Sequence, residues 1–469
     1  MFNEEILMNG IGLSVYKQPN KFLTAIRSFF CSYLFFIFQT IAACYFVATR
    51  QELVGLISFA VCICLILIVC EDILPTTLPF LIISCMATNL YDSFNLFIPY
   101  IIYAPCVVAA VVFHFVVYKK PMRSGDSVSG LLAVSLAITA GGLGRFTFME
   151  YACGSYYIFG LGLGMVATYF LMKSQFTVQR SYDIRTRFSV IMTLMGLFCC
   201  FMIAMGYYKL HKGWITLLYP YGFSRNNLST MLMFAMPFPL YFSKKCGLSG
   251  VFSALFYAMI AVTTSRGGLI FGGVEFVVCA IYWVVIGQGK WKKILRLFFL
   301  SVCIVVIIFG AGKIMLDVLF DRIIDNDGIT NDARWKMLWQ AIEKFRKSPV
   351  SGYGILDKTL QYESMRKKGA LTWYHMMIPQ VFGSMGLVGV VCYVFQFFGR
   401  VKLILKKACH WSMVLGLSYL GVLLMSQVNP GEFCPLPFQL LTVLLFILQE
   451  NRTMPVFPLY KIGKKKRKE

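Results

Sequence analysis

The chain has 469 residues, of which 58% are hydrophobic and 14% are charged, and its mean hydropathy is +0.70. A soluble domain carries about 25% charged residues, so this composition excludes an ordinary soluble protein and indicates an integral membrane protein. The formal net charge of +23 could suggest a nucleic-acid partner. The basic residues, however, cluster just beyond apolar runs, which is typical of a membrane protein. We therefore expect that nucleic acid is not a partner of this protein.

Long apolar runs follow one another along the chain, and each run of about 18 residues or more is a candidate spanning helix. The first run, near residues 28–48, is long enough to be a spanning helix, and we do not expect it to be a cleaved signal peptide. We expect an all-α, polytopic integral membrane protein of about 12–14 transmembrane helices, folded as a single membrane domain, 1–469. The expected helix centres lie near residues 38, 60, 81, 106, 134, 162, 198, 234, 256, 276, 303, 386, 420 and 441.

The basic clusters indicate which loops face the cytoplasm. If the N-terminus is cytoplasmic, all the strong clusters fall on the cytoplasmic side, as the positive-inside pattern requires. They lie at residues 119–123, 173–187, 243–245, 290–296, 400–407 and in the basic cytoplasmic tail, 461–469. Such clusters can also hold anionic lipid head groups.

The same topology puts residues 208–225, the turn near 265–267 and the long segment 313–373 outside. The segment 313–373 carries eleven Lys/Arg and eight Asp/Glu, so we expect one large extracytoplasmic loop with a substantial polar element. Loops of this length in a compact fold are usually functional.

Part of this loop is expected to form a short amphipathic helix after Asp332, which can cap its start. Ser348-Pro349 and Gly352 would end it. We expect the helix to lie along the membrane surface with its tryptophans at the interface. The expected apolar face is Trp335, Leu338, Trp339, Ile342 and Phe345, and the polar face is Lys336, Glu343, Lys344 and Lys347.

The sixteen cysteines mostly lie inside apolar runs and show no paired metal-ligand spacing, so we interpret them as small buried hydrophobes. The stretch "DNDGITNDARW" resembles a calcium loop, but aligning Gly328 with the loop glycine puts Ile323 at the first ligand position. We therefore expect no metal site and no cofactor.

Arginines on the predicted outer side are candidates for binding an anionic group. Arg334 lies in the first turn of the amphipathic helix, and its guanidinium suits phosphate oxygens. Arg266 in "VTTSRGGLIFGG" and Arg225 in "YPYGFSRNNLSTMLM" each precede an apolar run. A solvated side chain is the alternative for Arg334, and a snorkelling one for Arg266.

Two further residue types could take part in chemistry. His375 has an ordinary pKa of about 6.5, which suits proton transfer near neutrality, although an interfacial anchor is the alternative. Asn226 and Asn227 can cap a helix or hydrogen-bond a sugar. In the expected topology His375 faces the same side as the three arginines.

The sequence resembles the superfamily of bacterial O-antigen polymerases and O-antigen ligases. Three pieces carry the resemblance: "RWKML", with Arg334 and Leu338; "HMMIPQVFGSMGLVG", with His375 followed by Gly386 and Gly389; and the loop sequences "GFSRNN" and "TSRGG". It covers residues 220–395. Met376 departs from the ligase pattern, which usually has Asn, Ser or Gln there, so the polymerase is favoured while the ligase stays open.

The resemblance implies a glycosyltransferase of the bacterial cytoplasmic membrane, with both termini cytoplasmic. It would transfer glycan from a polyprenyl-diphosphate-linked donor to a sugar hydroxyl at the outer face, by an inverting, metal-independent reaction. His375 and Arg334 are then expected to be catalytic, and Arg266, Arg225 and Asn227 to bind diphosphate or glycan. The expected partners are the glycan donor and acceptor, membrane lipids, a flippase and a chain-length regulator.

Two other functions remain open. A ligase would attach finished polymer to a lipid or another acceptor. A flippase or transporter for lipid-linked sugars would need charged residues near the bilayer midplane and an internal repeat, and the sequence shows mostly helix-end charges and no repeat.

Overall fold

The computed structural model describes residues 21–87, 104–142, 156–176, 182–212, 225–287, 289–319, 333–354, 374, 376–406, 408–429 and 436–451. Within these ranges every regular element is a helix. This confirms the all-α fold, which suits a chain whose backbone polar groups must be satisfied inside a bilayer. The predictions for the N-terminal segment before residue 21 and for the basic tail, 461–469, lie outside the described residues.

The helices of the first half are α1 Lys21–Phe30, α2 Tyr33–Ala48, α3 Glu52–Val69, η1 Leu74–Thr76, α4 Thr77–Ala87, α6 Ala104–Val117, α7 Val128–Gly142, η5 Tyr156–Leu163, α9 Gly164–Gln175 and α10 Ile184–His211. Those of the second half are α11 Arg225–Ala235, η6 Phe238–Lys244, α12 Gly250–Val262, α13 Arg266–Val285, α14 Lys290–Leu319, α15 Ala333–Lys347, α17 Met377–Leu405, α18 His410–Met425 and α19 Leu436–Glu450. Each of the fourteen expected centres falls within one of them.

Five of the described helices are long and apolar enough to cross a membrane, or six if the bent pair α1 and α2 counts as one span. Six shorter apolar helices lie among them, so the described residues hold twelve apolar helical units. This fits the expected polytopic membrane protein. One boundary differs from the sequence prediction, because α14 continues to Leu319 and so extends into the segment 313–373 that we expected to be loop.

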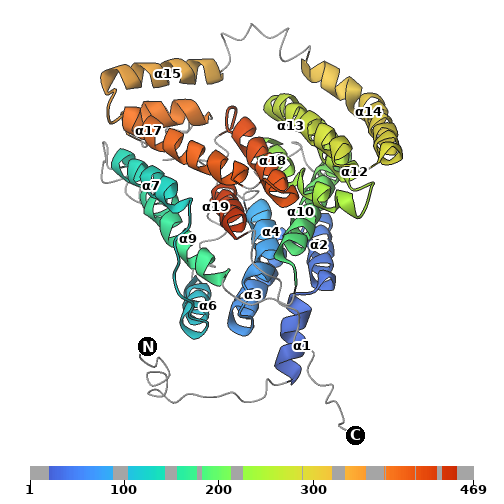
Figure 1. Cartoon of the computed structure of the whole chain (residues 1–469), viewed down its shortest axis with the longest axis horizontal. Helices are drawn as coiled ribbons and strands as arrows, with labels where there is room; N and C mark the ends of the chain where they lie inside the picture. The colour runs from blue at the N-terminus through green and yellow to red at the C-terminus, as the bar shows by residue number, and fades with distance from the viewer. Residues whose placement is uncertain are drawn as a thin grey trace.

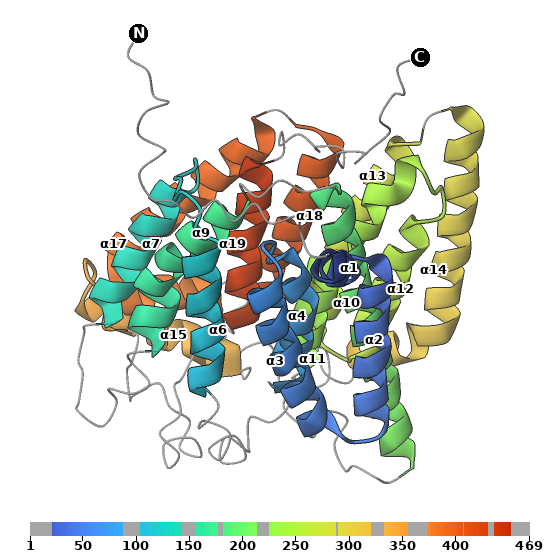
Figure 2. The ribbon, with the colours of Figure 1, turned by 90° about the horizontal axis from the view of Figure 1, so that it is seen from below.

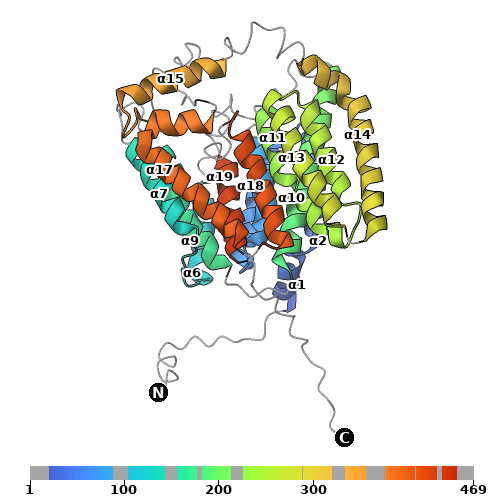
Figure 3. The same ribbon diagram turned by 45° about the horizontal axis from the view of Figure 1, so that its top comes forward.

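The helices form a bundle with α10, α11, α18 and α19 near its centre (Figures 1 and 3). α7, α9 and α17 flank the centre on one side, and α12, α13 and α14 on the other, with α14 at the outer edge (Figure 2). α15 lies across one end of the bundle, beside α17 (Figure 1).

The span after Arg225 is broken. α11 ends at Ala235, and the 3₁₀ helix η6 continues from Phe238 after Pro237. A proline cannot donate the backbone hydrogen bond that an α-helix needs, so it ends α11 there. Leu228–Ala235 are all buried, which fits the rule that broken helices at membrane depth are shielded by protein.

Two groups of helix ends make contacts at opposite ends of the bundle. At one end, Asp183 before α10 accepts a hydrogen bond from Tyr241 of η6 (3.0 Å), and Glu450 of α19 pairs with Lys173 of α9 (2.6 Å). The described residues of the predicted cytoplasmic clusters 119–123, 173–187, 243–245, 290–296 and 400–407 lie at this end, which we call the basic end. At the other end, called the site end, α11 and α13 begin and α18 finishes, as described below.

The helix predicted after Asp332 is present as α15, and it finishes at Lys347, just before Ser348-Pro349. The side of α15 that packs on protein is a different face from the apolar one that we predicted to lie on the membrane. Trp335 and Trp339 are exposed, whereas Met337 and Ala341 are buried against Tyr374 and Phe382. Lys344, predicted to face away, is buried, and its ammonium lies 3.9 Å from the centre of the Tyr353 ring. A helix packed on protein turns a different side inward from one lying on lipid.

The helix α17 is broken at Gly386, where φ is 62° and ψ is −154°. The chain that follows α15 pairs with both sides of the break. The N–H groups of Tyr353 and Gly354 donate to Gly383 O and Ser384 O (both 3.0 Å), and those of Leu387 and Val388 donate to Pro349 O (2.8 Å) and Val350 O (3.1 Å). These bonds satisfy backbone groups that a helix end would otherwise leave without partners.

The break divides α17 into two parts. Residues 377–385 lie next to α15 at the site end, and residues 387–405 continue along the bundle (Figure 3). At 1.5 Å per residue the second part is about 28 Å long, close to the about 30 Å hydrocarbon core of a bilayer. The apolar run near residue 386 therefore contains a short helix, 377–385, followed by one full membrane span, 387–405.

We predict that Gly386→Ala destabilises the protein by more than about 2 kcal/mol. The backbone at residue 386 occupies a region open almost only to glycine, at a cost of about 1–3 kcal/mol for other residues. A Cβ there would also lie 2.5 Å from Gly352 N and Val350 O. The free energy of unfolding in mixed micelles measures the effect. Gly399→Ala is the control, because a Cβ on this residue of the same helix has nothing within 4 Å; equal behaviour of the two variants would contradict the role of the break.

Candidate functional site

The start of α13 is held in an unusual backbone conformation. Thr264 has φ of 57°, which is a real outlier for a β-branched residue. Ser265 then caps the helix, since its hydroxyl accepts a hydrogen bond from Gly268 N (3.2 Å). Arg266 is the first helical residue and is partly exposed. Backbone strain of this kind clusters at functional sites.

The glycines after Arg266 allow close packing, as the sequence suggested. A Cβ on Gly267 would overlap the side chain of Val428, and one on Gly268 would lie 2.7 Å from Ser229 Cβ. Because Ser229 belongs to α11 and Val428 follows α18, the start of α13 fits between these two elements.

The start of α11 bonds directly to the same turn. Arg225 Nη1 donates to Thr264 Oγ1 (3.4 Å), and Asn226 Oδ1 accepts from Ser265 Oγ (2.8 Å). Asn226 and Asn227 both lie within the first turn of α11. The side-chain hydrogen bonds of Asn226 to Ser265 and of Asn227 to Asn429 are therefore bridges to neighbouring elements.

The end of α18 completes this cluster. Asn429 Nδ2 donates to Asn227 Oδ1 (3.1 Å), and Asn429 is buried. The start of α17 joins it through the backbone, because Met377 N donates to Ser426 O (2.8 Å). The starts of α11, α13 and α17 and the end of α18 therefore meet at the site end.

The neighbours of His375 are fixed on both sides. Tyr374 is buried against α15 and α17, and its N–H donates to Gln380 Oε1 (3.1 Å). Met377, two residues after His375, carries the bond to α18. His375 itself lies outside the described residues. Arg334 lies in the first turn of α15, but its side chain is not among those described.

The structure thus brings together Arg225, Asn227 and Arg266, and it does not place the side chains of the two predicted catalytic residues. Both arginines begin a helix, where unpaired N–H groups and the helix dipole favour a negative charge. Such a pair of helix starts can bind a diphosphate. At the same end, on α15, the hydrogen bond from Lys347 (2.6 Å) and its charge lower the pKa of the exposed Glu343.

Among the described residues, no group of three or more His, Cys, Asp and Glu side chains is placed to hold a metal ion. Their fourteen cysteines are all free thiols.

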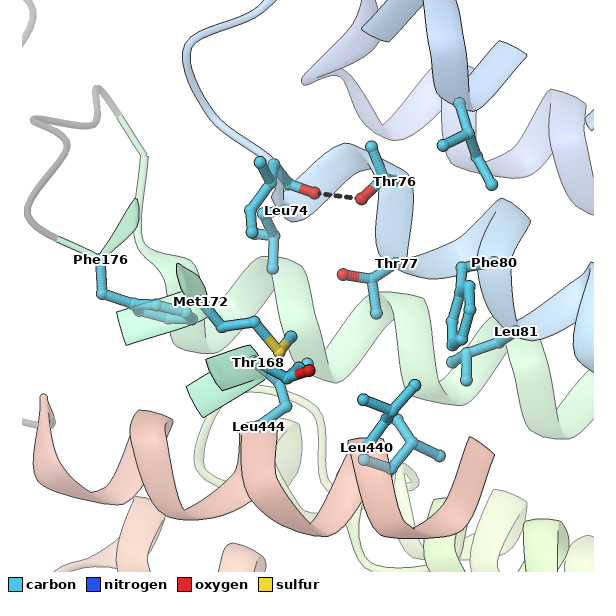
Figure 4. Close-up of a pocket in the computed structure, with 13 residues that line it drawn as sticks. Leu74, Thr76, Thr77, Phe80, Leu81, Thr168, Met172, Phe176, Leu440 and Leu444 are labelled. Atoms are coloured by element: carbon cyan, nitrogen blue, oxygen red, sulfur yellow. Dashed lines mark hydrogen bonds between the residues drawn. The ribbon is translucent and has the colours of Figure 1, made fainter. Parts of the chain in front are cut away.

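A separate apolar cavity of about 230 Å³ lies between α4, α9 and α19 (Figure 4). Its wall includes Phe80, Met172 and Leu444, and Thr76 Oγ1 beside it donates to Ile73 O (2.6 Å). It borders the end of α9 near the basic end and contains none of the candidate residues. Its lining is mostly apolar, and the polar side chains in it are the threonines Thr76, Thr77 and Thr168.

Sequence reasoning missed Asn429, Thr264 and Gln380. Asn429 had a weak signal, because it is a polar residue followed by Pro430 after an apolar run. Thr264 and Gln380 had none: a positive φ and a bond to Tyr374 N depend on the tertiary fold.

Residues 251–394 match a family model described as O-antigen ligase. The match begins in α12 and ends within α17, so it includes the positions of Arg266, Arg334 and His375. Arg225 and Asn227 precede it. No curated protein and no solved structure matches the chain.

We predict that Ser265→Ala lowers the free energy of unfolding by about 1–2 kcal/mol, because it removes a helix cap and the bond to Asn226. Unfolding in mixed micelles measures it. Ser301→Ala is the matched control, since this exposed hydroxyl bonds only within its own helix, to Leu297 O (2.9 Å); it should change stability by no more than about 0.5 kcal/mol. Equal losses would contradict the bridging role of Ser265.

Proposed function

We propose, from the membership of this chain in the superfamily of O-antigen ligases and polymerases, that it polymerises polyprenyl-diphosphate-linked repeat units at the outer face of the bacterial cytoplasmic membrane. The observation that carries the proposal is the junction of two arginine-led helix starts, those of α11 and α13, bridged by Asn226 and Ser265 (2.8 Å). That the chain is a membrane protein of this glycosyl-transfer family does not depend on whether it polymerises repeat units.

The orientation proposed for the protein in the membrane follows from the distribution of its basic residues. The basic end carries the clusters 119–123, 173–187, 243–245, 290–296 and 400–407, and the positive-inside pattern makes it cytoplasmic. The site end then faces outward, together with α15. A lipid-linked donor presented at the outer leaflet would have its diphosphate at the depth of Arg225 and Arg266.

In the proposed reaction these two arginines hold the diphosphate, and Asn227 hydrogen-bonds the glycan. An acceptor hydroxyl attacks the anomeric carbon from the face opposite the diphosphate, a new C–O bond forms, and the bond to the diphosphate oxygen breaks. The leaving polyprenyl diphosphate takes the electron pair and gains one negative charge. Preorganised guanidinium groups stabilise such developing charge.

His375 and Arg334 complete the proposed catalytic set. The hydroxyl proton passes to the His375 ring, whose ordinary pKa suits a general base. Arg334 adds a further positive charge next to the departing diphosphate. The support for both is that the elements that carry them, the start of α17 and the start of α15, are joined to the site end through Met377 and Tyr374. No metal is needed in this scheme.

Ligase-type transfer is the second candidate, and the description of the matched family, O-antigen ligase, favours it. Met376 and the sequence "GFSRNN" favour the polymerase. The two reactions share the donor and differ in the product, because a ligase makes one transfer to a lipid or another acceptor and a polymerase makes a ladder.

A flippase or transporter remains the alternative from another class. It calls for ionisable residues inside the membrane and an internal repeat. The described helices bury several ionisable residues, among them Glu275 of α13, whose two carboxyl oxygens have no hydrogen-bond partner in the described residues. The sequence shows no internal repeat, so we favour the enzyme.

We predict that purified protein converts a lipid-linked repeat unit into a ladder of longer lipid-linked chains. His375→Ala, Arg334→Ala and Arg266→Ala should each lower the rate by at least about 100-fold, as loss of a charge-stabilising or proton-transferring group does. Gel electrophoresis of labelled glycan measures both the rate and the product distribution. The flippase and the chain-length regulator expected as partners are left out of this assay.

Arg346→Ala is the matched control, because Arg346 is an exposed arginine on α15, three turns from Arg334. It should retain activity within about twofold. Full activity of the His375 and Arg334 variants would contradict the proposed site. A single transferred unit in place of a ladder would identify the ligase reaction.

A further inference from the structure

A second polar site lies at the basic end, away from the candidate transfer site. A cavity of about 260 Å³ opens between η6, the loop that leads into α12, and the first turns of α14. Its lining includes Lys244, Lys245, Lys292 and Arg296, and none of the described residues that line it is Asp or Glu. We call it the basic pocket. Four positive charges with no acidic residue in the wall create a strong local attraction for an anion.

The guanidinium of Arg296 forms the fixed part of this pocket. Arg296 is only 4% exposed, and its Nη1 and Nη2 donate to Trp283 O and Ser243 O, both at 2.5 Å. Nε is buried and has no hydrogen-bond partner among the described residues. The two carbonyls come from the ends of α13 and η6, so the arginine joins both elements to α14. Its charge is balanced only by carbonyl groups, which leaves a full positive charge buried at the pocket.

The other wall of the pocket is apolar. Leu248, Leu295 and Phe299 line it together with the lysines. Leu295 also begins the exposed face of α14, which continues along the helix through Phe298, Val302, Val306 and Phe309. Only 11% of the α14 span is buried inside the protein, against 28–61% for the other four long spans. An apolar face this open, at the edge of the bundle (Figure 2), contacts the acyl chains of the bilayer.

We propose that the basic pocket binds the phosphate of an anionic glycerophospholipid, whose acyl chains lie along the exposed face of α14. The polar part of the pocket matches the phosphate and the apolar part matches the glycerol and the first carbons of the chains. Trp291, 83% exposed in the first turn of α14, lies where aromatic side chains meet the head-group layer. A free phosphate would use the cations but not the apolar wall or the continuous face below it.

The bound lipid would hold α14 against the bundle. α14 packs mainly against α12 and α13, Arg296 bonds it to Ser243 of η6, and its long outer face is exposed. A phosphate shared by Lys244 of η6 and Lys292 of α14 would link the two elements from outside. The basic pocket lies at the opposite end from Arg225 and Arg266. Lipid binding there therefore does not depend on which reaction the protein catalyses.

The test compares two double variants with equal loss of charge. Lys244→Gln/Lys292→Gln removes two cations from the pocket. Lys290→Gln/Lys293→Gln removes two exposed lysines from the same helix turns of α14 that do not line it. Each protein, purified in a neutral detergent, is titrated with phosphatidylglycerol, with phosphatidylcholine and with inorganic phosphate. Bound lipid is counted by native mass spectrometry, and the melting temperature is recorded in parallel.

Wild-type protein and Lys290→Gln/Lys293→Gln should retain phosphatidylglycerol and melt at a higher temperature in its presence, with little response to phosphatidylcholine. Lys244→Gln/Lys292→Gln should bind phosphatidylglycerol at least about tenfold more weakly, as loss of about 1 kcal/mol per basic residue implies, while melting as the wild type does without lipid. An equal loss in both double variants would overturn the proposal, because the affinity would then follow net charge. Stabilisation by inorganic phosphate as large as that by the lipid would overturn it as well.

Discussion

The break in α17 at Gly386 organises the site end of this protein. Four backbone hydrogen bonds join the chain after α15 to the two sides of the break, and two glycines, Gly352 and Gly386, let the backbones approach. The junction adds to the packing of α15 on Tyr374 and Phe382 and to the bond from Met377 N to Ser426 O (2.8 Å), which hold the same two elements. With it, the helix that carries Arg334 and the chain around His375 are attached to the membrane bundle.

The bilayer explains why irregular backbone occurs where it does. Backbone groups at membrane depth need partners inside the protein, and three irregular points of this structure fit that requirement. α11 breaks at Pro237 among buried neighbours, α17 breaks where another segment pairs with it, and the turn at Thr264–Ser265 is bonded to Arg225 and Asn226. The helix starts that result carry the N–H groups and dipoles that favour an anion. The same constraint that shapes the fold thus provides a candidate phosphate site.

The sequence was sufficient to predict the helices and their order, because long apolar runs have few alternatives in a membrane. It was also sufficient to group Arg225 with Arg266, since charge alternation assigns their loops to one side, and the bonds between α11 and α13 agree. It could not predict the break at Gly386, which depends on a partner segment more than thirty residues away. It also could not predict which residues of α15 pack on protein, where Met337, Ala341 and Lys344 are buried, because the amphipathic pattern does not reveal whether lipid or protein covers a face of the helix.

The central claim is that the starts of α11 and α13 hold the diphosphate of a lipid-linked glycan. The most direct measurement is a cryo-electron microscopy structure of the protein in lipid nanodiscs with a polyprenyl-diphosphate-linked repeat unit bound. The account predicts diphosphate density within hydrogen-bond distance of the guanidinium of Arg225 or Arg266, at the end of the bundle that carries α15. Diphosphate density at the opposite end, or one that touches neither arginine, would contradict it.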